Sequence, residues 1–209
     1  IMKVMETNNS IHLDSAKRVF AIEAQAVSAL SEQIDNDFCK AIEHIIASEG
    51  RTIICGMGKS GIIGKKIAAT FASTGTPSFF MHPGEAYHGD LGMVTSEDTF
   101  IAISFSGETD EVVKLLPYLK DSGNFLVAIT GNPASTLARA ADCHLNVSVK
   151  EEACPLQLAP TSSTTTTLAM GDALAVTLMK ARDFKPENFA RFHPGGSLGR
   201  RLLSRVEHE

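Results

Sequence analysis

Two short segments carry glycine, serine and threonine at places where an apolar run passes into a helical pattern. Residues 56–61 read Gly-Met-Gly-Lys-Ser-Gly, and residues 104–109 read Ser-Phe-Ser-Gly-Glu-Thr. Backbone amides and hydroxyls at the amino terminus of a helix bind phosphate. The glycines could simply make a tight turn, and Thr109 could simply cap its helix. Two such segments together favour a phosphorylated small molecule bound between them.

Neither segment has a nucleotide-binding pattern. The first lacks the GxGxxG sequence of dinucleotide sites, and Ile53 stands where a P-loop would have its first glycine. We therefore expect neither ATP nor NAD as a ligand, and no redox cofactor.

Titratable side chains near the predicted strand ends could supply acid–base chemistry. Glu111 stands at the start of a predicted helix, where an acid also stabilises the helix dipole. Residues 82–90 hold two histidines and two carboxylates, which could transfer protons or, as a weaker alternative, bind a metal. A base beside a carbonyl, with a group that stabilises the enediolate oxygen, would isomerise a sugar phosphate between aldose and ketose. The set expected to do this is Lys59, His88, Glu111, Glu152 and His193.

The apolar pattern predicts the elements that position these groups. An amphipathic helix is predicted to start at Asp14–Ser15, a second to cover residues 37–47, and a long one to run from Thr161 to Arg182. A stripe at helical spacing predicts one further helix after the third strand, with Val112, Leu115, Leu116 and Leu119 facing the sheet. The predicted strands are residues 52–55, 78–81, 99–103, 125–129 and 143–149.

The alternation of strands and helices predicts the fold class. Five strands separated by helix-length segments favour an α/β fold with a five-stranded parallel sheet flanked by helices on both faces. In such sheets ligands bind beyond the carboxyl ends of the strands, so the loops after each strand are where chemistry is expected.

Composition excludes several classes of protein. Nineteen Lys and Arg against 24 Asp and Glu give a net charge of −5 over 209 residues, which disfavours nucleic acid as a partner. No apolar stretch is suited to a membrane span, and residues 1–10 lack the apolar core of a signal peptide, so we expect a cytoplasmic protein. The spacing of the four cysteines fits neither a metal pair nor a disulfide framework, so we expect reduced, mostly buried thiols.

Several motifs together resemble the sugar isomerase (SIS) domain of bacterial D-arabinose 5-phosphate isomerases. The resemblance covers nearly the whole chain. It implies one SIS domain over residues 1–209, a flavodoxin-like three-layer sandwich with a helical segment at 14–48, a sheet-containing core at 50–150 and C-terminal helices at 161–209. The motifs that carry it are residues 56–61, 69–80, 82–85, 88–94, 152–155, 158–165 and 193–196.

This resemblance implies an activity and roles for individual residues. The activity is interconversion of D-ribulose 5-phosphate and D-arabinose 5-phosphate, which leads to the acid sugar Kdo of lipopolysaccharide and some capsules, without a required cofactor. Zinc is implied as an inhibitor bound at His82 and His88, and a homotetramer with shared active sites is implied as the assembly. Catalytic roles fall on Lys59, His88, Glu111, Glu152 and His193. Substrate contacts fall on Ser60, Gly75, Thr76, His82, His88, Ser104, Ser106 and Thr109.

The chain departs from the family pattern in two respects. Phe105 stands where a small polar residue is expected, and Thr109 and Asp110 replace a pair of serines. The family continues into a pair of CBS modules where this sequence stops, so we expect a truncated form, with a naturally short enzyme as the alternative. A sugar-phosphate sensor without turnover, an isomerase of another ketose phosphate and a purely structural oligomerisation domain remain the competing functions.

Overall fold

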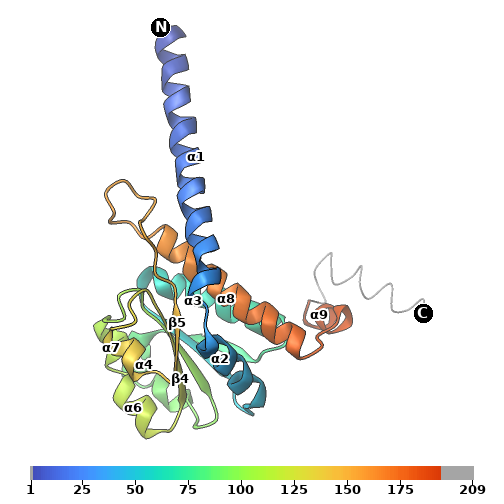
Figure 1. Cartoon of the computed structure of the whole chain (residues 1–209). Coiled ribbons are helices and arrows are strands. Elements are labelled where there is room, and N and C mark those ends of the chain that lie inside the picture. The colour runs from blue at the N-terminus through green and yellow to red at the C-terminus, as the bar shows by residue number, and fades with distance from the viewer. Residues whose placement is uncertain (1, 194–209) are drawn as a thin grey trace, which may run out of the picture.

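The fold is a parallel β-sheet between two layers of helices (Figure 1). The computed structural model describes residues 2–193, with side chains from Asn9 onward. Every neighbouring pair of strands is parallel, in the order β2-β1-β3-β4-β5. The strands are β1 (Thr52–Gly56), β2 (Ser78–Met81), β3 (Thr99–Ile103), β4 (Phe125–Thr130) and β5 (Cys143–Asn146). The predicted fold class and the five strands are confirmed.

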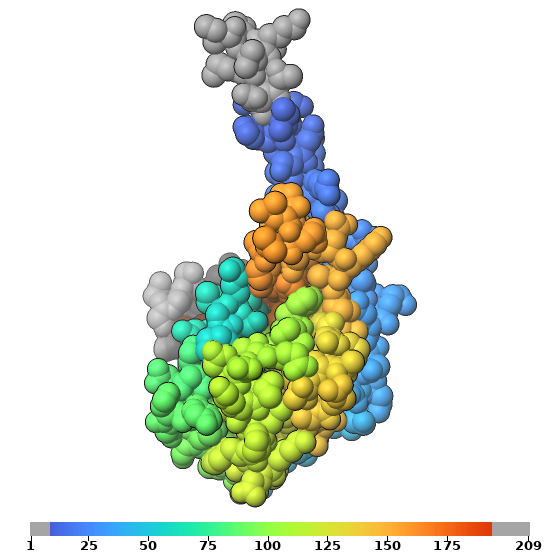
Figure 2. Space-filling model, turned by 90° about the vertical axis from the view of Figure 1, so that its left-hand side faces the viewer, coloured from blue at the N-terminus to red at the C-terminus, as the bar shows by residue number. Residues whose placement is uncertain are grey.

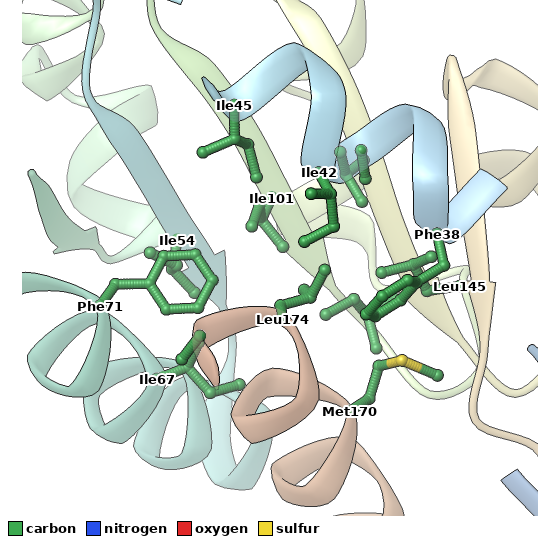
Figure 3. Packing of buried hydrophobic residues seen from close by; sticks show 14 of the residues in the cluster. Phe38, Ile42, Ile45, Ile54, Ile67, Phe71, Ile101, Leu145, Met170 and Leu174 are labelled. Atoms are coloured by element: carbon green, nitrogen blue, oxygen red, sulfur yellow. The ribbon is translucent and has the colours of Figure 1, made fainter. Parts of the chain in front are cut away.

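One face of the sheet is covered by α2 (Asn36–Ala47), α3 (Gly58–Ser73) and α8 (Ser162–Ala181). Figure 3 shows their apolar side chains meeting those of the strands. The central strands are fully buried on both faces, which is why they read as continuous apolar runs rather than as an alternating pattern. The residues labelled there are Phe38, Ile42, Ile45, Ile67, Phe71, Met170 and Leu174 of the helices and Ile54, Ile101 and Leu145 of the strands.

Within residues 2–193 the opposite face carries only short helices. These are α4 (Pro83–Tyr87), the 3-10 helix η1 (Asp90–Met93), α5 (Asp110–Val113), α6 (Leu116–Asp121) and α7 (Thr136–Ala140). Buried side chains of α4, α5, α6 and α7 pack on Ile53, Phe100 and Leu126 to form a second apolar cluster, against which the partly buried Leu91 of η1 also packs. The sheet is thereby enclosed, and its carboxyl edge is left as the place where loops can form a site.

The single helix predicted after the third strand is wrong, because two short helices, α5 and α6, stand in its place. Pro117 has no backbone N–H to donate, and its ring clashes with the carbonyl four residues earlier, so a continuous helix is interrupted. The predicted apolar stripe still faces the core, with all four of its members buried.

The predicted start of the first helix at Asp14–Ser15 is also wrong. Helix α1 runs over Met2–Gln33, and Asp14 lies inside it, 3.4 Å from the Ser10 hydroxyl and 3.9 Å from the Lys17 ammonium. Such pairs three or four residues apart stabilise an exposed helix, so a residue type typical of helix starts is tolerated within one. Figure 1 shows the first half of α1 standing away from the body of the molecule.

The remaining elements agree closely with the prediction, apart from the end of the fifth strand. Helix α8 begins after Thr161 and ends before Arg182 as expected, whereas the fifth strand ends at Asn146, because the Asn146 side chain accepts a hydrogen bond from the N–H of Ser148 and turns the chain. Helix α9 (Pro186–Phe192) closes the described region, and residues 194–209 lie outside it. Among the described helices none combines the length and apolar character that crossing a bilayer requires.

The four cysteines are free, as expected, but the expectation that most are buried is wrong. Cys39 is exposed and Cys154 is half-exposed, while Cys55 and Cys143 are buried in the sheet. Burial raises the pKa of the Cys55 thiol to about 12 and that of Cys143 to about 11, so both stay protonated at neutral pH.

Candidate active site

A cavity of about 490 Å³ opens at the carboxyl edge of the sheet. Its walls are the start of α3, the loop after β3, and the segment from Glu152 to the first turns of α8, and Figure 2 shows these segments around a hollow. Strands β1 and β3 are neighbours, but the chain continues from β1 to β2 on one side and from β3 to β4 on the other. The cavity therefore lies at the point where the strand order reverses, the usual ligand position in open α/β sheets.

The start of α3 offers unpaired amides and one cation to the cavity. Gly58 has a φ of 57°, and Lys59 and Ser60 follow it in the first turn and line the cavity. A Cβ on Gly61 would come within 2.5 Å of the Gly56 carbonyl, so only glycine lets the helix start this close to the strand end. Among the residues that the structure describes, no side chain caps α3, so its first amides are available to bind an anion.

The loop after β3 gathers three hydroxyls. The Ser104 Oγ lies 2.7 Å from the Thr109 Oγ1 and 3.5 Å from the Ser106 Oγ. Gly107, with a φ of 68°, turns its N–H back to the Ser104 hydroxyl at 3.1 Å. Thr109 occupies the N-cap position of α5, but within residues 2–193 its side chain makes no capping hydrogen bond, so capping does not account for this hydroxyl. Ser106 and Thr109 line the cavity, while Ser104 lies buried behind them.

Glu152 brings a carboxylate into the same cavity from the segment after β5. Its Oε2 accepts hydrogen bonds from the N–H and the hydroxyl of Thr161, at 2.7 and 2.9 Å, and from the N–H of Ser163 at 3.2 Å. Burial raises the pKa of this carboxyl, but the hydrogen bonds from Ser163 and Thr161 outweigh it, so its pKa lies below the ordinary value. Glu152 is therefore ionised at neutral pH and able to accept a proton.

The cavity combines groups that can bind an anion with a carboxylate that can accept a proton. Lys59 and Glu152 are the charged side chains that line it. The Ser60 hydroxyl lies on the same wall as Lys59, at the start of α3, and the hydroxyls of Ser106 and Thr109 lie on the wall formed by the loop after β3. Of the predicted site residues the structure thus brings five to one cavity and places Ser104 directly beneath them. Such an arrangement can hold a phosphorylated sugar by one end and remove a proton from the other.

The two histidines predicted as metal ligands lie outside this cavity. His82 caps α4, with its Nδ1 accepting the N–H of Gly84 at 3.2 Å, and His88 is exposed at the other end of that helix with its ring edge-on to Tyr87. Within residues 2–193 no three His, Cys, Asp or Glu side chains are grouped so as to hold a metal ion.

Two further predicted catalytic residues also stand apart from the cavity. Glu111 is exposed in the first turn of α5, and His193 follows α9 with its ring stacked 4.0 Å from that of Phe189. Helix α8, with 20 residues and about 30 Å in length, lies between its first turn at the cavity and α9 (Figure 1).

Gly75 and Thr76 lie at the opposite edge of the sheet, because they precede β2 instead of following a strand. Gly75 has a φ of 93° and packs on Phe184, where an added Cβ would be 2.7 Å from the ring. Thr76 is 2% exposed, and its hydroxyl has no hydrogen-bond partner among the described residues. Within one chain neither residue reaches the cavity.

Several cavity residues were given no role by the sequence analysis. They are Gln157 and, on the first turns of α8, Ser163, Thr164 and Thr167. Their signal in the sequence is a hydroxyl-rich start to a helix whose later turns are apolar. Phe105, noted as a departure from the family pattern, lines the cavity and packs its ring over Gly131, where an added Cβ would lie 2.6 Å from it.

Comparison with known proteins places the chain in a family. Residues 45–177, which include both hydroxyl-rich loops and Glu152, match the model of the SIS domain. The chain belongs to the SIS domain family.

Individual SIS proteins resemble the chain over most of its length. Arabinose 5-phosphate isomerase KdsD of Pseudomonas aeruginosa is 56% identical over 99% of the chain, and KdsD of Escherichia coli K12 is 60% identical over 92% of it. The chain spans 63% and 58% of the lengths of these two relatives. A protein of E. coli CFT073 solved in complex with arabinose 5-phosphate has a TM-score of 0.84 and 44% identity over 90% of this chain and 98% of that one.

Proposed function

We propose that this SIS chain interconverts D-arabinose 5-phosphate and D-ribulose 5-phosphate. The observation that carries the proposal is the single cavity in which Lys59, Ser106 and Thr109 share the walls with the ionised Glu152. The names of the KdsD relatives and the sugar-phosphate complex of the E. coli CFT073 protein support a five-carbon sugar phosphate as substrate.

The arrangement supports an enediol mechanism. The phosphate binds the amides of α3 and the hydroxyls of Ser60, Ser106 and Thr109. From the open-chain aldose, Glu152 takes the proton on C2, and the electrons of that bond move to the carbonyl oxygen to give an enediolate whose oxygen Lys59 stabilises. Return of the proton to C1, with transfer of a hydroxyl proton from O2 to O1, gives the ketose. We propose His88 for ring opening and Glu111 as the other candidate base.

A turnover assay tests this function directly. The purified chain is incubated with D-ribulose 5-phosphate and a chelator, and formation of D-arabinose 5-phosphate is followed by NMR, with a hexulose 6-phosphate as the comparison substrate. Saturable turnover of the pentose phosphate with little conversion of the hexulose phosphate is expected. Faster conversion of the hexulose phosphate would refute the substrate, and saturable binding without turnover would replace the enzyme with a sugar-phosphate sensor.

We further propose a homotetramer whose subunits share active sites. Gly75, His82, His88, Glu111 and His193 lie away from the cavity of their own chain, so their proposed contacts with substrate require a neighbouring copy. Thr76 also lies away from the cavity, but it is buried in its own chain and offers no surface to such a copy. Helix α1 exposes Ile11, Leu13 and Phe20, at 62%, 60% and 70%, as apolar surface for such an assembly. Mixing inactive Lys59→Ala and His193→Ala chains should restore part of the activity. No recovery, or a monomer by light scattering, would refute shared sites.

The remaining proposals concern metal, location and pathway. We propose that no metal or redox cofactor is required, that zinc inhibits through His82 and His88, and that the enzyme acts in the cytoplasm on the route to Kdo for lipopolysaccharide or capsule. Activity that survives a chelator, and zinc inhibition that weakens in His88→Gln, would support the first two points. Zinc inhibition unchanged in that variant would refute the proposed metal ligands.

A further inference from the structure

The Thr161 hydroxyl is the centre of the hydrogen bonds around Glu152. Its Oγ1 accepts the N–H of Ala153 at 2.9 Å and the N–H of Cys154 at 3.4 Å, and it donates to the Glu152 Oε2 at 2.9 Å. A hydroxyl has one proton and two lone pairs. Because both lone pairs receive backbone N–H groups, its single proton is directed to the carboxylate.

This count determines which carboxylate oxygen can be protonated. The three groups that reach Oε2, the N–H and hydroxyl of Thr161 and the N–H of Ser163, are all donors, so Oε2 has to remain an acceptor. Within residues 2–193 the hydrogen bonds from the two backbone N–H groups and from the Thr161 hydroxyl all reach Oε2, and none of them reaches Oε1. The Ser163 hydroxyl is a further donor to this carboxyl group and lowers its pKa as well. A proton removed from a substrate can therefore be received at Oε1 without breaking any of these bonds.

Gln157 holds the backbone of the same residue. Its Oε1 accepts the Glu152 N–H at 2.8 Å, and its Nε2 donates to the carbonyls of Glu152 at 2.7 Å and Cys154 at 3.1 Å. Gln157 has a φ of 54°, a conformation that costs a side-chain-bearing residue energy and persists where surrounding contacts impose it. Its side chain lines the cavity on one side and a groove against α1 on the other.

We propose that Thr161 and Gln157 are positioning residues that hold Oε2 of Glu152 as a hydrogen-bond acceptor and leave Oε1 as the atom that takes the substrate proton. The inference rests on the proposed isomerase function and specifies the atom at which its base acts. Neither residue touches the reacting carbons; both act through Glu152.

Other charged groups near the loop belong to different elements. Lys59 of α3 lines the same cavity, Asp14 and Arg18 of α1 line the groove beyond Gln157, and Glu23 of α1 accepts the Thr165 hydroxyl of α8 at 3.0 Å. A Thr161→Val change alters none of these charges. It removes one donor from the ionised carboxylate, so the pKa of Glu152 should rise and the acid limb of the kcat–pH profile should move to higher pH.

Kinetics of matched variants test the proposal. Thr161→Val should lower kcat about tenfold with little change in KM, since a hydrogen bond to a charged group is lost, and Thr161→Ser should restore both kcat and the pH profile. In a Glu152→Gln background Thr161→Val should add little further loss. Gln157→Met should also lower kcat. Thr70→Val, which removes a hydroxyl that donates to the Lys66 carbonyl, should have no effect.

The opposite results would overturn the proposal. Wild-type kcat in Thr161→Val, an unshifted pH profile, or an equal loss in the Glu152→Gln background would show that the hydroxyl does not act through Glu152. Wild-type kinetics in Gln157→Met would remove Gln157 from the proposal.

A second measurement does not depend on turnover. The carboxyl carbon of Glu152, assigned by its absence from Glu152→Gln, is titrated by NMR in the wild type, Thr161→Val and Thr161→Ser. A higher pKa in the valine variant alone supports the positioning role, and identical titrations refute it. Absence of turnover in the wild type would refute the isomerase function, and this titration would still decide the hydrogen-bond arrangement.

Discussion

Removing the charge of Lys59 is the most direct perturbation of the cavity. Lys59→Met keeps the length and most of the apolar stem of the side chain while deleting the cation that lines the walls with Glu152. The chain has a net charge of −5, so no general positive field replaces it for an anionic substrate. We expect the variant to fold normally, because no hydrogen bond or ion pair to another described residue holds this ammonium.

The size of the effect follows from the setting of the ammonium. Two unit charges about 4 Å apart interact by about 4 kcal/mol at an effective dielectric constant of about 20, which is an upper bound. A charge-assisted hydrogen bond contributes about 1.5–3 kcal/mol. Lys59 is exposed within an open cavity, so solvent screening favours the lower part of this range. A loss of about 2 kcal/mol corresponds to about a 30-fold decrease in kcat/KM.

The assay compares Lys59→Met with Lys65→Met. Lys65 lies on the same helix, is exposed and stands 5.4 Å from the centre of the Phe80 ring, outside the cavity. Both variants change the net charge equally, so a general electrostatic effect would appear in both. Initial rates with D-ribulose 5-phosphate give kcat and KM for each chain, and circular dichroism verifies folding.

A kcat/KM in Lys59→Met within threefold of the wild type would refute the role of Lys59. An equal decrease in Lys65→Met would show that the effect is one of net charge, so the reasoning from cavity geometry would fail.

Two further predictions concern the scaffold that holds the site. Gly107→Ala would place a Cβ 2.0 Å from the Ser135 Oγ at a residue with a left-handed backbone, so we expect the free energy of unfolding, measured in urea, to fall by about 2–4 kcal/mol. Gly123→Ala has the same backbone strain but open space around the added Cβ, so its expected loss is about 1–2 kcal/mol. Equal losses in the two variants would refute the clash. The buried Asp98 accepts a hydrogen bond from Arg51 Nη2 at 2.8 Å. Burial raises the pKa of Asp98, but the hydrogen bonds from Arg51 and from neighbouring amides lower it by more, so its pKa lies below the ordinary value. Its stabilisation is therefore present above the ordinary value of 3.8 and lost as the pH falls through the lower folded-state pKa, so Asp98→Asn should cost about 2–4 kcal/mol at pH 7 and clearly less near pH 3; a pH-independent difference would refute this.

The sequence predicts most of the scaffold because its signals are local. Each buried strand is a short apolar run, and α8 was predicted to within a residue at both ends. The break between α5 and α6 was also encoded locally, in Pro117, but the apolar stripe concealed it, since both short helices still bury their apolar side chains. The placement of Gly75 and Thr76 could have been predicted as well, because residues before a parallel strand lie at its amino edge.

The composition of the cavity depends on contacts between distant segments. Glycine- and hydroxyl-rich loops after β1 and β3 identified Lys59, Ser60, Ser106 and Thr109, because a helix start beside a strand end is recognisable in sequence. Only the strand order brings these two loops together, and only the return of the chain after β5 brings Glu152 to them. The hydrogen bonds that make Oε2 an acceptor join residues 9 and 11 positions apart through an irregular loop. No periodic pattern encodes such a loop, so its geometry was decided by tertiary structure.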